Sequence, residues 1–331
     1  MLAAYIERLG TPEEIRVGEL ADPRPGPTDV LVEVQATTVN PVDTFVRSGR
    51  FRTPVPFPFV IGRDLVGRVV ETGPGAHGFA AGDPVWGNSL GHEGRQGAAA
   101  ERAVVAADRL YRLPERVDPY EAVAVVHPAA TAHLALFTHG GLRVGETVLV
   151  AGAAGNVGSA LVTLAVEAGA RVLATAAPRD AGYCRSLGAT AAFDYADPDL
   201  TSRLRKAAPD GVDLHLDTSG GNDLTAAVEV LAHRGRIVLL AGATTAPVLP
   251  AGRLYLKDGS VRGFVISHAT SAELAAAAVA INRLLPAGRL RPRAREVRPL
   301  SAAAEAHRGL EAGELSGKRV VLSIRSKSNN S

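Results

Sequence analysis

Three glycines spaced G-x-x-G-x-x-G are the residues of this sequence with the clearest chemical meaning. They stand between an apolar run that ends at Ala151 and an Ala/Leu-rich segment. Such a turn lets the backbone approach a diphosphate closely, and the helix that it opens directs unpaired N–H groups and its positive dipole end at the anion. The pattern predicts dinucleotide binding, with an ordinary packing turn as the alternative. The residues expected at the diphosphate are Gly152, Ala153, Ala154, Gly155, Asn156, Val157 and Gly158.

The end of the next apolar run bears on which dinucleotide is bound. NAD sites place an acidic residue there for the ribose 2′-hydroxyl, whereas NADP sites place a cation. Residues 171–177 end without an acid, and Arg179 follows them. A planar guanidinium suits a 2′-phosphate, and so does the hydroxyl of Tyr195 after the following run. We therefore expect NADPH, with Thr175, Arg179 and Tyr195 on that side, unless Arg179 is only an exposed arginine at the start of a helix.

The elements that must position these residues alternate between helix-length Ala/Leu segments and short Val/Ile/Leu runs over residues 121–266. Runs without polar alternation fit strands covered on both faces, and helices between them imply right-handed crossovers. This pattern predicts an α/β fold with a Rossmann-type, doubly wound parallel sheet. The expected strands include 146–152, 171–177, 191–197, 212–220 and 260–267, and the expected helices include 158–170, 224–235, 272–285 and 302–310.

Residues 1–120 have a different pattern, with short alternating runs separated by Pro/Gly-rich turns. That pattern is typical of a β-barrel-like module. The last apolar run, near residues 318–324, is expected to rejoin this first module, because the segment 267–331 is too short for a core of its own. The final residues, 326–331, are expected to be a disordered end.

Composition excludes several classes of protein. The net charge of +2 in 331 residues is too small for a nucleic-acid-binding surface, and no stretch approaches the roughly 20 apolar residues of a membrane span. One cysteine, Cys184, cannot form a disulfide within the chain or a four-ligand zinc site by itself. We expect a cytoplasmic protein with neither a membrane nor a nucleic acid as its partner.

Five motifs in order carry a resemblance to a known family: VNPVDTFVRSGRF at 39–51, IGRDLVGRVVETG at 61–73, GDPVWG at 82–87, ATAHLAL at 130–136 and AGAAGNVG at 151–158. With them the chain resembles the medium-chain dehydrogenase/reductase superfamily, and most of all its zinc-independent quinone oxidoreductase branch, which includes zeta-crystallin. The resemblance covers essentially the full length. It implies a GroES-like catalytic domain of residues 1–120, completed by 267–331, an NADP-binding Rossmann domain of residues 121–266, and an active site in the cleft between them.

The same resemblance argues against zinc. Zinc-dependent relatives carry an early catalytic cysteine, and they have Gly-His-Glu where this chain has Gly62-Arg63-Asp64; arginine cannot ligate a metal. A second triplet, Gly91-His92-Glu93, is expected to be a solvated loop rather than a metal site. Without a Lewis acid, the expected chemistry is hydride delivery to an electron-poor acceptor, a quinone or an α,β-unsaturated carbonyl.

The resemblance implies three catalytic positions: Asn40, Asp43 and Thr131. Asn40 would lie beside the nicotinamide and the substrate, where its amide suits a developing enolate oxygen, although capping the turn before Pro41 is an equal alternative. Asp43 is expected to orient Asn40 or to pair with Arg47. Thr131 would lie near the cofactor or bond its own helix backbone. His127, His133 and His268 are interpreted as surface or packing residues.

Two phenylalanines, Phe45 and Phe51, stand where close relatives tend to have tyrosines. Their pocket would be more apolar, which favours a bulkier acceptor and protonation by solvent. Phe264 and Val265 would wall the nicotinamide, with plain core as the alternative for Phe264. The remaining positions expected at the cofactor are Ser219, Gly242, Ala243, Phe264, Val265 and Lys318.

Two further functions stay open at this point. One is an enoyl reductase of a polyketide-type pathway, which would suit a Phe-lined pocket. The other is a cofactor-binding protein with little turnover. The resemblance also implies a homodimer in which the strand at 260–267, at the edge of its sheet, pairs with its counterpart.

Overall fold

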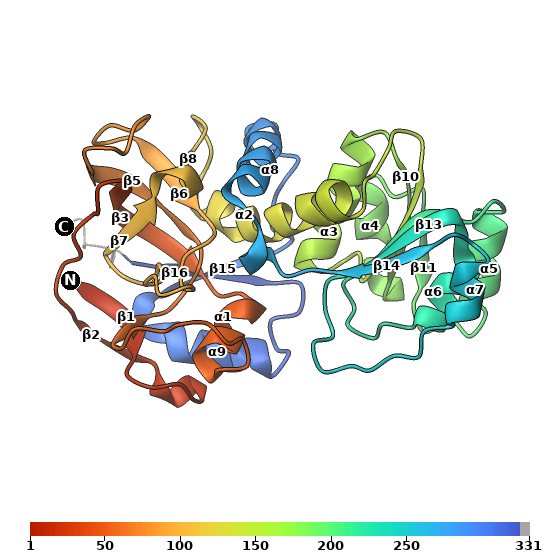
Figure 1. The fold of residues 1–331 in the computed structure, drawn as a ribbon, viewed down its shortest axis with the longest axis horizontal. Helices are drawn as coiled ribbons and strands as arrows, with labels where there is room; N and C mark the ends of the chain where they lie inside the picture. Colours follow the sequence, from red (N-terminus) through yellow and green to blue (C-terminus); the bar gives the residue numbers. More distant parts are fainter. Residues whose placement is uncertain (325–331) are drawn as a thin grey trace. The chain divides into compact units, whose positions relative to one another are not determined.

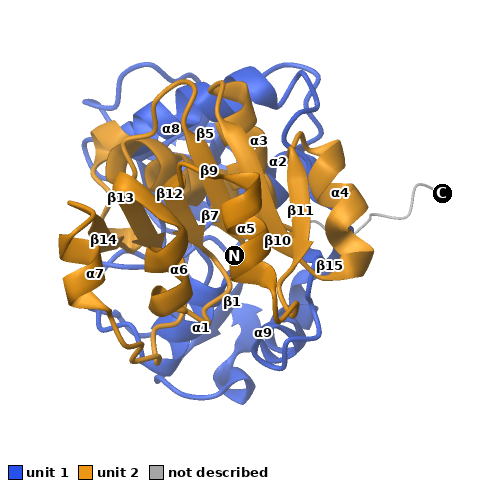
Figure 2. Cartoon of the chain, turned by 90° about the vertical axis from the view of Figure 1, so that its right-hand side faces the viewer, with its two compact units in different colours: residues 1–127, 274–331 blue, residues 128–273 orange. Residues whose placement is uncertain are grey.

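The computed structural model describes residues 1–324, so the predicted disordered end at 326–331 lies outside the described residues. The chain divides into two compact units (Figure 2): unit 1 comprises residues 1–127 and those from 274 on, and unit 2 comprises residues 128–273. These boundaries fall later in the chain than the 120/121 and 266/267 boundaries of the sequence-based prediction. Among residues 1–324, no helix has the length and apolar character needed to cross a membrane.

Unit 2 is built on a parallel sheet (Figure 1), in which every paired strand runs in the same direction as its neighbour. Its strands are β9 (Thr147–Ala151), β10 (Arg171–Ala176), β11 (Ala191–Asp194), β12 (Val212–Asp217), β13 (Leu231–Leu239) and β14 (Ser260–Gly263). Their order is β11-β10-β9-β12-β13-β14. The chain thus adds β10 and β11 on one side of β9 and then β12, β13 and β14 on its other side. Because the crossovers are right-handed, the helices of these two halves cover opposite faces of the sheet. The α/β prediction with a doubly wound parallel sheet is confirmed.

The helical segments of unit 2 follow these strands. They are the end of α2 (Pro119–His133), a π-helical turn (Leu134–His139), α3 (Asn156–Glu167), a 3-10 turn (Pro178–Asp180), α4 (Ala181–Ser186), α5 (Leu200–Ala207), α6 (Leu224–Val230), α7 (Ala251–Tyr255) and a 3-10 turn (Ile266–His268). Leu204 of α5 and Val230 of α6 pack with Leu149 and Leu173 of the sheet in one apolar cluster. Burial of these side chains holds the two helices to that face.

Several expected elements of unit 2 differ in their bounds from the structure, and two of the differences are instructive. The predicted helix over 224–235 is wrong in its second half, because α6 ends at Val230 and the chain continues directly as β13. Leu231 is buried and pairs with Val212 of β12, so sheet pairing overrides the local helical preference. The expected strand over 260–267 is shorter than predicted, since β14 ends at Gly263.

Unit 1 contains two sheets. The smaller has the order β2 (Arg16–Glu19), β1 (Leu2–Ile6), β4 (Phe59–Val60). The larger has the order β15 (Arg295–Pro299), β16 (Arg319–Ser323), β3 (Asp29–Thr38), β5 (Leu65–Thr72), β6 (Pro84–Gly87), β8 (Tyr111–Arg112), with β7 (Arg102–Ala106) also on β3. Its helical segments are α1 (Pro41–Ser48), most of α2, α8 (Ser271–Leu284), α9 (Ala303–Glu311) and 3-10 turns at Pro12–Glu14, Ala107–Arg109 and Leu300–Ala302.

The last described strand, β16, lies inside the larger sheet of unit 1. It pairs parallel to β15 and antiparallel to β3, with Val321 opposite Thr38. Alternate residues of β3, among them Val30, Val32 and Val34, are buried in the main apolar cluster of this unit. The chain therefore returns to its first module after the parallel sheet, and this return brings Arg319 next to the end of β3.

Candidate active site

The glycine turn, residues 152–155, connects β9 to α3 in unit 2, and the glycines are needed for its geometry. Gly152 has φ +76°, in the left-handed region, and a Cβ there would lie 2.6 Å from Thr218 Oγ1. A Cβ at Gly158 would lie 2.2 Å from the Gly152 carbonyl oxygen. Gly155 is the N-cap of α3 and provides no side chain, so the first amides of the helix stay open to a ligand. These residues fit the diphosphate of a dinucleotide.

The adenosine-side residues lie at the carboxyl edge of β10 and β11. Thr175 is buried, and its carbonyl accepts a hydrogen bond of 3.0 Å from the Ala153 N–H, which ties β10 to the glycine turn. The Tyr195 N–H donates to the Ala176 carbonyl at 3.3 Å, which holds Tyr195 beside the end of β10. Arg179 follows in the 3-10 turn. Both side chains are exposed, and neither makes a hydrogen bond or ion pair within residues 1–324.

The turn after β12, residues 217–222, lies at the same edge and contains one expected residue, Ser219. Its hydroxyl donates to Asp217 Oδ1 at 2.6 Å. Two neighbours in this turn were not predicted from the sequence: Thr218, which donates to the Ala151 carbonyl at 2.7 Å, and Asn222, which donates to the Ala241 carbonyl at 3.1 Å. The motif DTSGGN shows that this segment is a turn, but it gives no sign of these distant partners.

The remaining expected residues of unit 2 have varied surroundings. Gly242 has φ +85°, and Ala243 is exposed. Phe264 is half-buried and stacks on His139, with ring centroids 4.2 Å apart and planes at 22°. Val265 is exposed. Thr131 lies in α2 and is half-buried.

In unit 1, Asn40 is the N-cap of α1 and is buried. Its Nδ2 donates to Asp64 Oδ2 at 2.7 Å, and its Oδ1 accepts from the Arg319 guanidinium at 3.0 Å. Asp43 Oδ2 accepts from the Asn40 backbone N–H at 2.7 Å and from its Nδ2 at 3.3 Å. Asp43 therefore orients Asn40. The alternative pairing of Asp43 with Arg47 is wrong, because Arg47 bonds to Glu311 and the Gly10 carbonyl.

Asp64 is the centre of this buried cluster. Its Oδ1 lies 2.9 Å from His127 Nδ1, and its Oδ2 accepts from the Thr38 hydroxyl at 2.6 Å. Burial raises the pKa of Asp64, but His127, Arg319 and Thr38 together lower it below its usual value. The expectation that His127 is only a surface or packing residue is wrong. Its partner is 63 positions away in the sequence, so spacing did not reveal it.

The second carboxyl group of the cluster, Asp43, has the opposite character. Burial, followed by the negative charge of Asp64, raises its pKa to about 6, while Arg63 opposes the rise. Its Oδ1 is buried and has no hydrogen-bond partner among residues 1–324. Asp43 therefore keeps its proton to a higher pH than an ordinary aspartate does.

The Gly91-His92-Glu93 segment was expected to be a solvated loop, but only part of it is exposed to solvent. Glu93 is exposed, but His92 is buried, with Nδ1 3.2 Å from the Arg63 guanidinium. Burial, followed by the charge of Arg63, lowers the pKa of His92 to about 4. Within residues 1–324, no group of three His, Cys, Asp or Glu residues could hold a metal ion.

The two phenylalanines expected in the substrate pocket are both half-buried, and the Phe51 N–H donates to the Phe45 carbonyl at 3.0 Å. Phe51 lines a pocket of about 390 Å³ together with Leu9, Val46 and Val55. Its walls are mainly apolar, with Arg52 at the side. Lys318, in the same unit, is exposed before β16.

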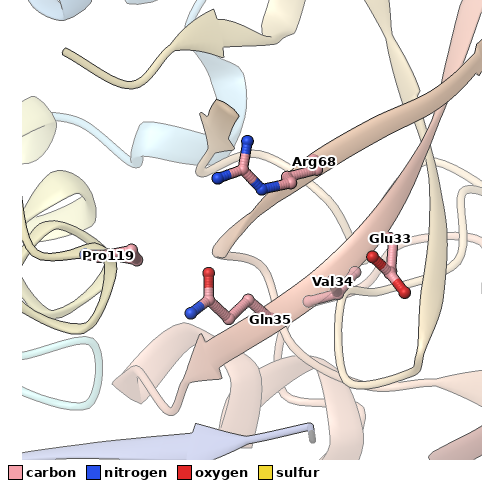
Figure 3. A pocket seen from close by; sticks show the side chains of 5 residues that line it. All are labelled: Glu33, Val34, Gln35, Arg68 and Pro119. Atoms are coloured by element: carbon pink, nitrogen blue, oxygen red, sulfur yellow. The ribbon is translucent and has the colours of Figure 1, made fainter. Parts of the chain in front are cut away.

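A second pocket of unit 1, of about 260 Å³, lies over β3 and β5 and contains none of the expected site residues. Figure 3 shows the Arg68 and Gln35 side chains extending toward Pro119, whereas the Glu33 carboxylate turns away. The Arg68 guanidinium already donates to the Gly82 carbonyl at 2.9 Å.

Comparison with known proteins agrees with this fold. Residues 26–115 match the family of alcohol dehydrogenase GroES-like domains, and residues 156–281 match the family of zinc-binding dehydrogenases. Quinone oxidoreductase of Sus scrofa is 30% identical over 97% of this chain and 98% of its own length.

Solved structures give the same picture. An NAD-dependent alcohol dehydrogenase superposes with a TM-score of 0.88 at 31% identity, over 98% of this chain and 100% of the other. A mycobacterial protein complexed with NADPH superposes with a TM-score of 0.83 at 28% identity, over 98% of this chain and 100% of the other.

A GroES-like unit together with a dinucleotide-type parallel sheet defines the medium-chain dehydrogenases and reductases. The chain belongs to this superfamily and, within it, to the quinone oxidoreductase branch, as its motifs predicted. It is an NAD(P)H-dependent oxidoreductase. The roles of the individual site residues stay predictions.

Proposed function

We propose that this protein is an NADPH-dependent, zinc-independent reductase that transfers a hydride to a quinone or an α,β-unsaturated carbonyl. The observation that carries the coenzyme choice is the pair Arg179 and Tyr195, both exposed beside the carboxyl edge of β10. A guanidinium and a hydroxyl there favour a 2′-phosphate over a bare ribose. One similar structure is of an NAD-dependent enzyme and another is of a complex with NADPH, so Arg179 and Tyr195 carry the choice of coenzyme.

The bound coenzyme supplies the hydride. The glycine turn and the first turn of α3 bind its diphosphate through backbone N–H groups, and Gly242, Ala243, Phe264 and Val265 are proposed at its nicotinamide half. Phe51, which lines the apolar pocket of unit 1, and Phe45, whose carbonyl accepts from the Phe51 N–H, are proposed to provide apolar surface for the acceptor.

Hydride addition leaves an electron pair on the acceptor's carbonyl oxygen, which must then gain a proton. Asn40 is poorly suited to this step, because its amide already bonds to Asp64, Asp43 and Arg319. Asp43 is poorly suited as well, because the residue is only 4% exposed and its Oδ1 is buried away from any acceptor. In this proposal solvent supplies the proton, and Asp43 and Asn40 hold each other in place.

Independence from zinc is supported by the donors that stand in this cluster. Both oxygens of Asp64 are engaged, by His127 on one side and by Thr38 and Asn40 on the other. The Arg319 guanidinium lies 3.8 Å from Asp64 Oδ2. A divalent cation would have to displace these partners and lie against a buried positive charge.

A homodimer in the cytoplasm completes the proposal. Within residues 1–324, β14 pairs only with β13, so its other edge is open. Val248, Tyr255 and Leu256, which precede this strand in the chain, are 78–79% exposed. Pairing of two β14 strands would satisfy the edge. Sedimentation of the purified protein as a monomer would reject this part.

The decisive experiment measures oxidation of NADPH and of NADH with a panel of quinones and a panel of enones, and separately with enoyl thioesters. We expect NADPH oxidation with members of one panel and a clear preference over NADH. Activity confined to enoyl thioesters would favour the polyketide-type enoyl reductase, which the Phe-lined pocket also suits. Coenzyme binding without turnover on any acceptor would leave a binding protein and refute the reductase.

A further inference from the structure

Strands β9, β12 and β13 end side by side in the sheet of unit 2, and side-chain hydrogen bonds link the segments that follow them. Thr218 Oγ1 donates to the Ala151 carbonyl at 2.7 Å, at the base of the glycine turn. Asn222 Nδ2 donates to the Ala241 carbonyl at 3.1 Å and to Thr245 Oγ1 at 2.8 Å. The 217–222 turn therefore connects the glycine turn to the loop after β13, residues 240–245.

The 217–222 turn is itself held by one buried carboxylate. Asp217, 4% exposed, accepts at Oδ1 from the Ser219 N–H and hydroxyl, at 2.8 and 2.6 Å. Its Oδ2 accepts from the Asn222 N–H at 3.1 Å. Three donors on a buried carboxylate fix the turn, because any opening leaves the charge without partners. The hydrogen bond from the Asn222 N–H to Asp217 thus fixes the position of Asn222.

Asn222 combines a left-handed backbone conformation with a buried and only partly hydrogen-bonded side chain. It has φ +50°, which asparagine tolerates better than most residues, and it is 3% exposed. Its Oδ1 is buried without a hydrogen-bond partner among residues 1–324. A Cβ added to Gly242 would lie 2.2 Å from Asn222 Nδ2. A side chain at position 242 would therefore collide with the Asn222 amide.

We propose that Asn222 is a positioning residue, which fixes the distance between the glycine turn and the 240–245 loop and so sets where the nicotinamide ring lies. The proposal rests on the proposed function, in which the glycine turn binds the diphosphate and Gly242 contacts the nicotinamide half. The adenosine half depends instead on β10 and β11, on the other side of β9. Loss of Asn222 therefore affects hydride transfer more than adenosine binding.

The test is Asn222→Gly, which removes the amide but keeps the left-handed backbone accessible. We expect kcat to fall about 10- to 100-fold, the effect of misplacing a reacting group by a fraction of an ångström to one ångström. The dissociation constant of 2′,5′-ADP, which carries only the adenosine half, stays within about two-fold, since that site is distant and independent. kcat is expressed per site titrated with 2′,5′-ADP, so unfolded protein does not contribute.

Two further variants separate positioning from stability. Thr245→Val removes the hydroxyl that accepts the hydrogen bond from Asn222 Nδ2, so it should also lower kcat. The double variant Asn222→Gly/Thr245→Val should show no further loss of kcat beyond that of Asn222→Gly. Asp223→Ala is the matched control: it removes the side chain that accepts the Ala226 N–H at the start of α6 and leaves the 240–245 loop alone. It should be less stable but retain kcat.

Two results would overturn the positioning role. One is an unchanged kcat in Asn222→Gly, and the other is a loss of 2′,5′-ADP affinity as large as the loss of kcat. A wild-type protein that does not bind 2′,5′-ADP would instead refute the NADPH proposal, so the two failures are distinguishable.

Discussion

Replacement of Arg179 by alanine gives the sharpest test of coenzyme choice. A hydrogen bond between a guanidinium and a phosphate contributes about 1.5–3 kcal/mol. Arg179 is exposed, so screening by water and salt places the value at the lower end, about 1.5 kcal/mol. Since 1.4 kcal/mol corresponds to a factor of ten, the dissociation constant for NADPH should rise about ten-fold. Binding of NADH, which has no 2′-phosphate, should not change.

The assay is calorimetric titration of wild type and variant with both coenzymes at low and moderate salt. The NADPH difference between wild type and Arg179→Ala should shrink as salt rises, because it is electrostatic. Arg185→Ala is the matched control: this arginine is also exposed, in the last turn of α4, and its loss should leave both constants unchanged. Equal weakening of NADPH and NADH by Arg179→Ala would show that the side chain does not read the 2′-phosphate, and no weakening would remove it from the site.

The remaining predictions concern stability and the glycine turn. His307 is buried, and burial lowers its pKa to about 3. Below pH 6.5 its imidazole therefore binds a proton in the unfolded chain but stays neutral in the folded chain. Between pH 7 and pH 5 the wild type should therefore lose about 2 kcal/mol more unfolding free energy than His307→Leu, measured with urea, and parallel losses would contradict this assignment. Gly158→Ala places a Cβ 2.2 Å from the Gly152 carbonyl oxygen, so the affinity for NADPH should fall at least about ten-fold, and calorimetry showing normal affinity would refute the turn's role. The Arg236 guanidinium binds both Glu146 oxygens at 2.8 Å, so Arg236→Lys should lower the unfolding free energy by about 2 kcal/mol, and urea curves that coincide with wild type would exclude this contribution.

Features encoded by neighbouring residues could be predicted from the sequence. The glycine turn is one example: its strand, its glycines and its helix lie within one short segment, and each glycine has a local steric reason. The parallel sheet is another, because the absence of polar alternation in its strands reflects burial on both faces. The end of β10 without an acidic residue was also readable directly.

Features that depend on distant pairs could not be predicted in the same way. Asp64 and His127 lie 63 positions apart, and Asn222 and Thr245 lie 23 apart, so no spacing rule connects them. The end of α6 at Val230 was missed for the same reason: the partner that draws Leu231 into a strand is Val212 of β12. The Gly-rich sequence around His92 predicts an exposed side chain, whereas the fold buries it.

The place of β16 has a consequence for biosynthesis. Arg319, which donates to Asn40 and Thr38, is carried by the last described strand, and that strand fills a gap between β15 and β3. A ribosome completes residues 128–273 before it makes β16. Unit 2 therefore has its whole sequence available for folding at a time when unit 1 still lacks β16. A chain that ended before residue 319 would retain every residue of the parallel sheet, whereas Asp64, Thr38 and Asn40 would lack the Arg319 guanidinium.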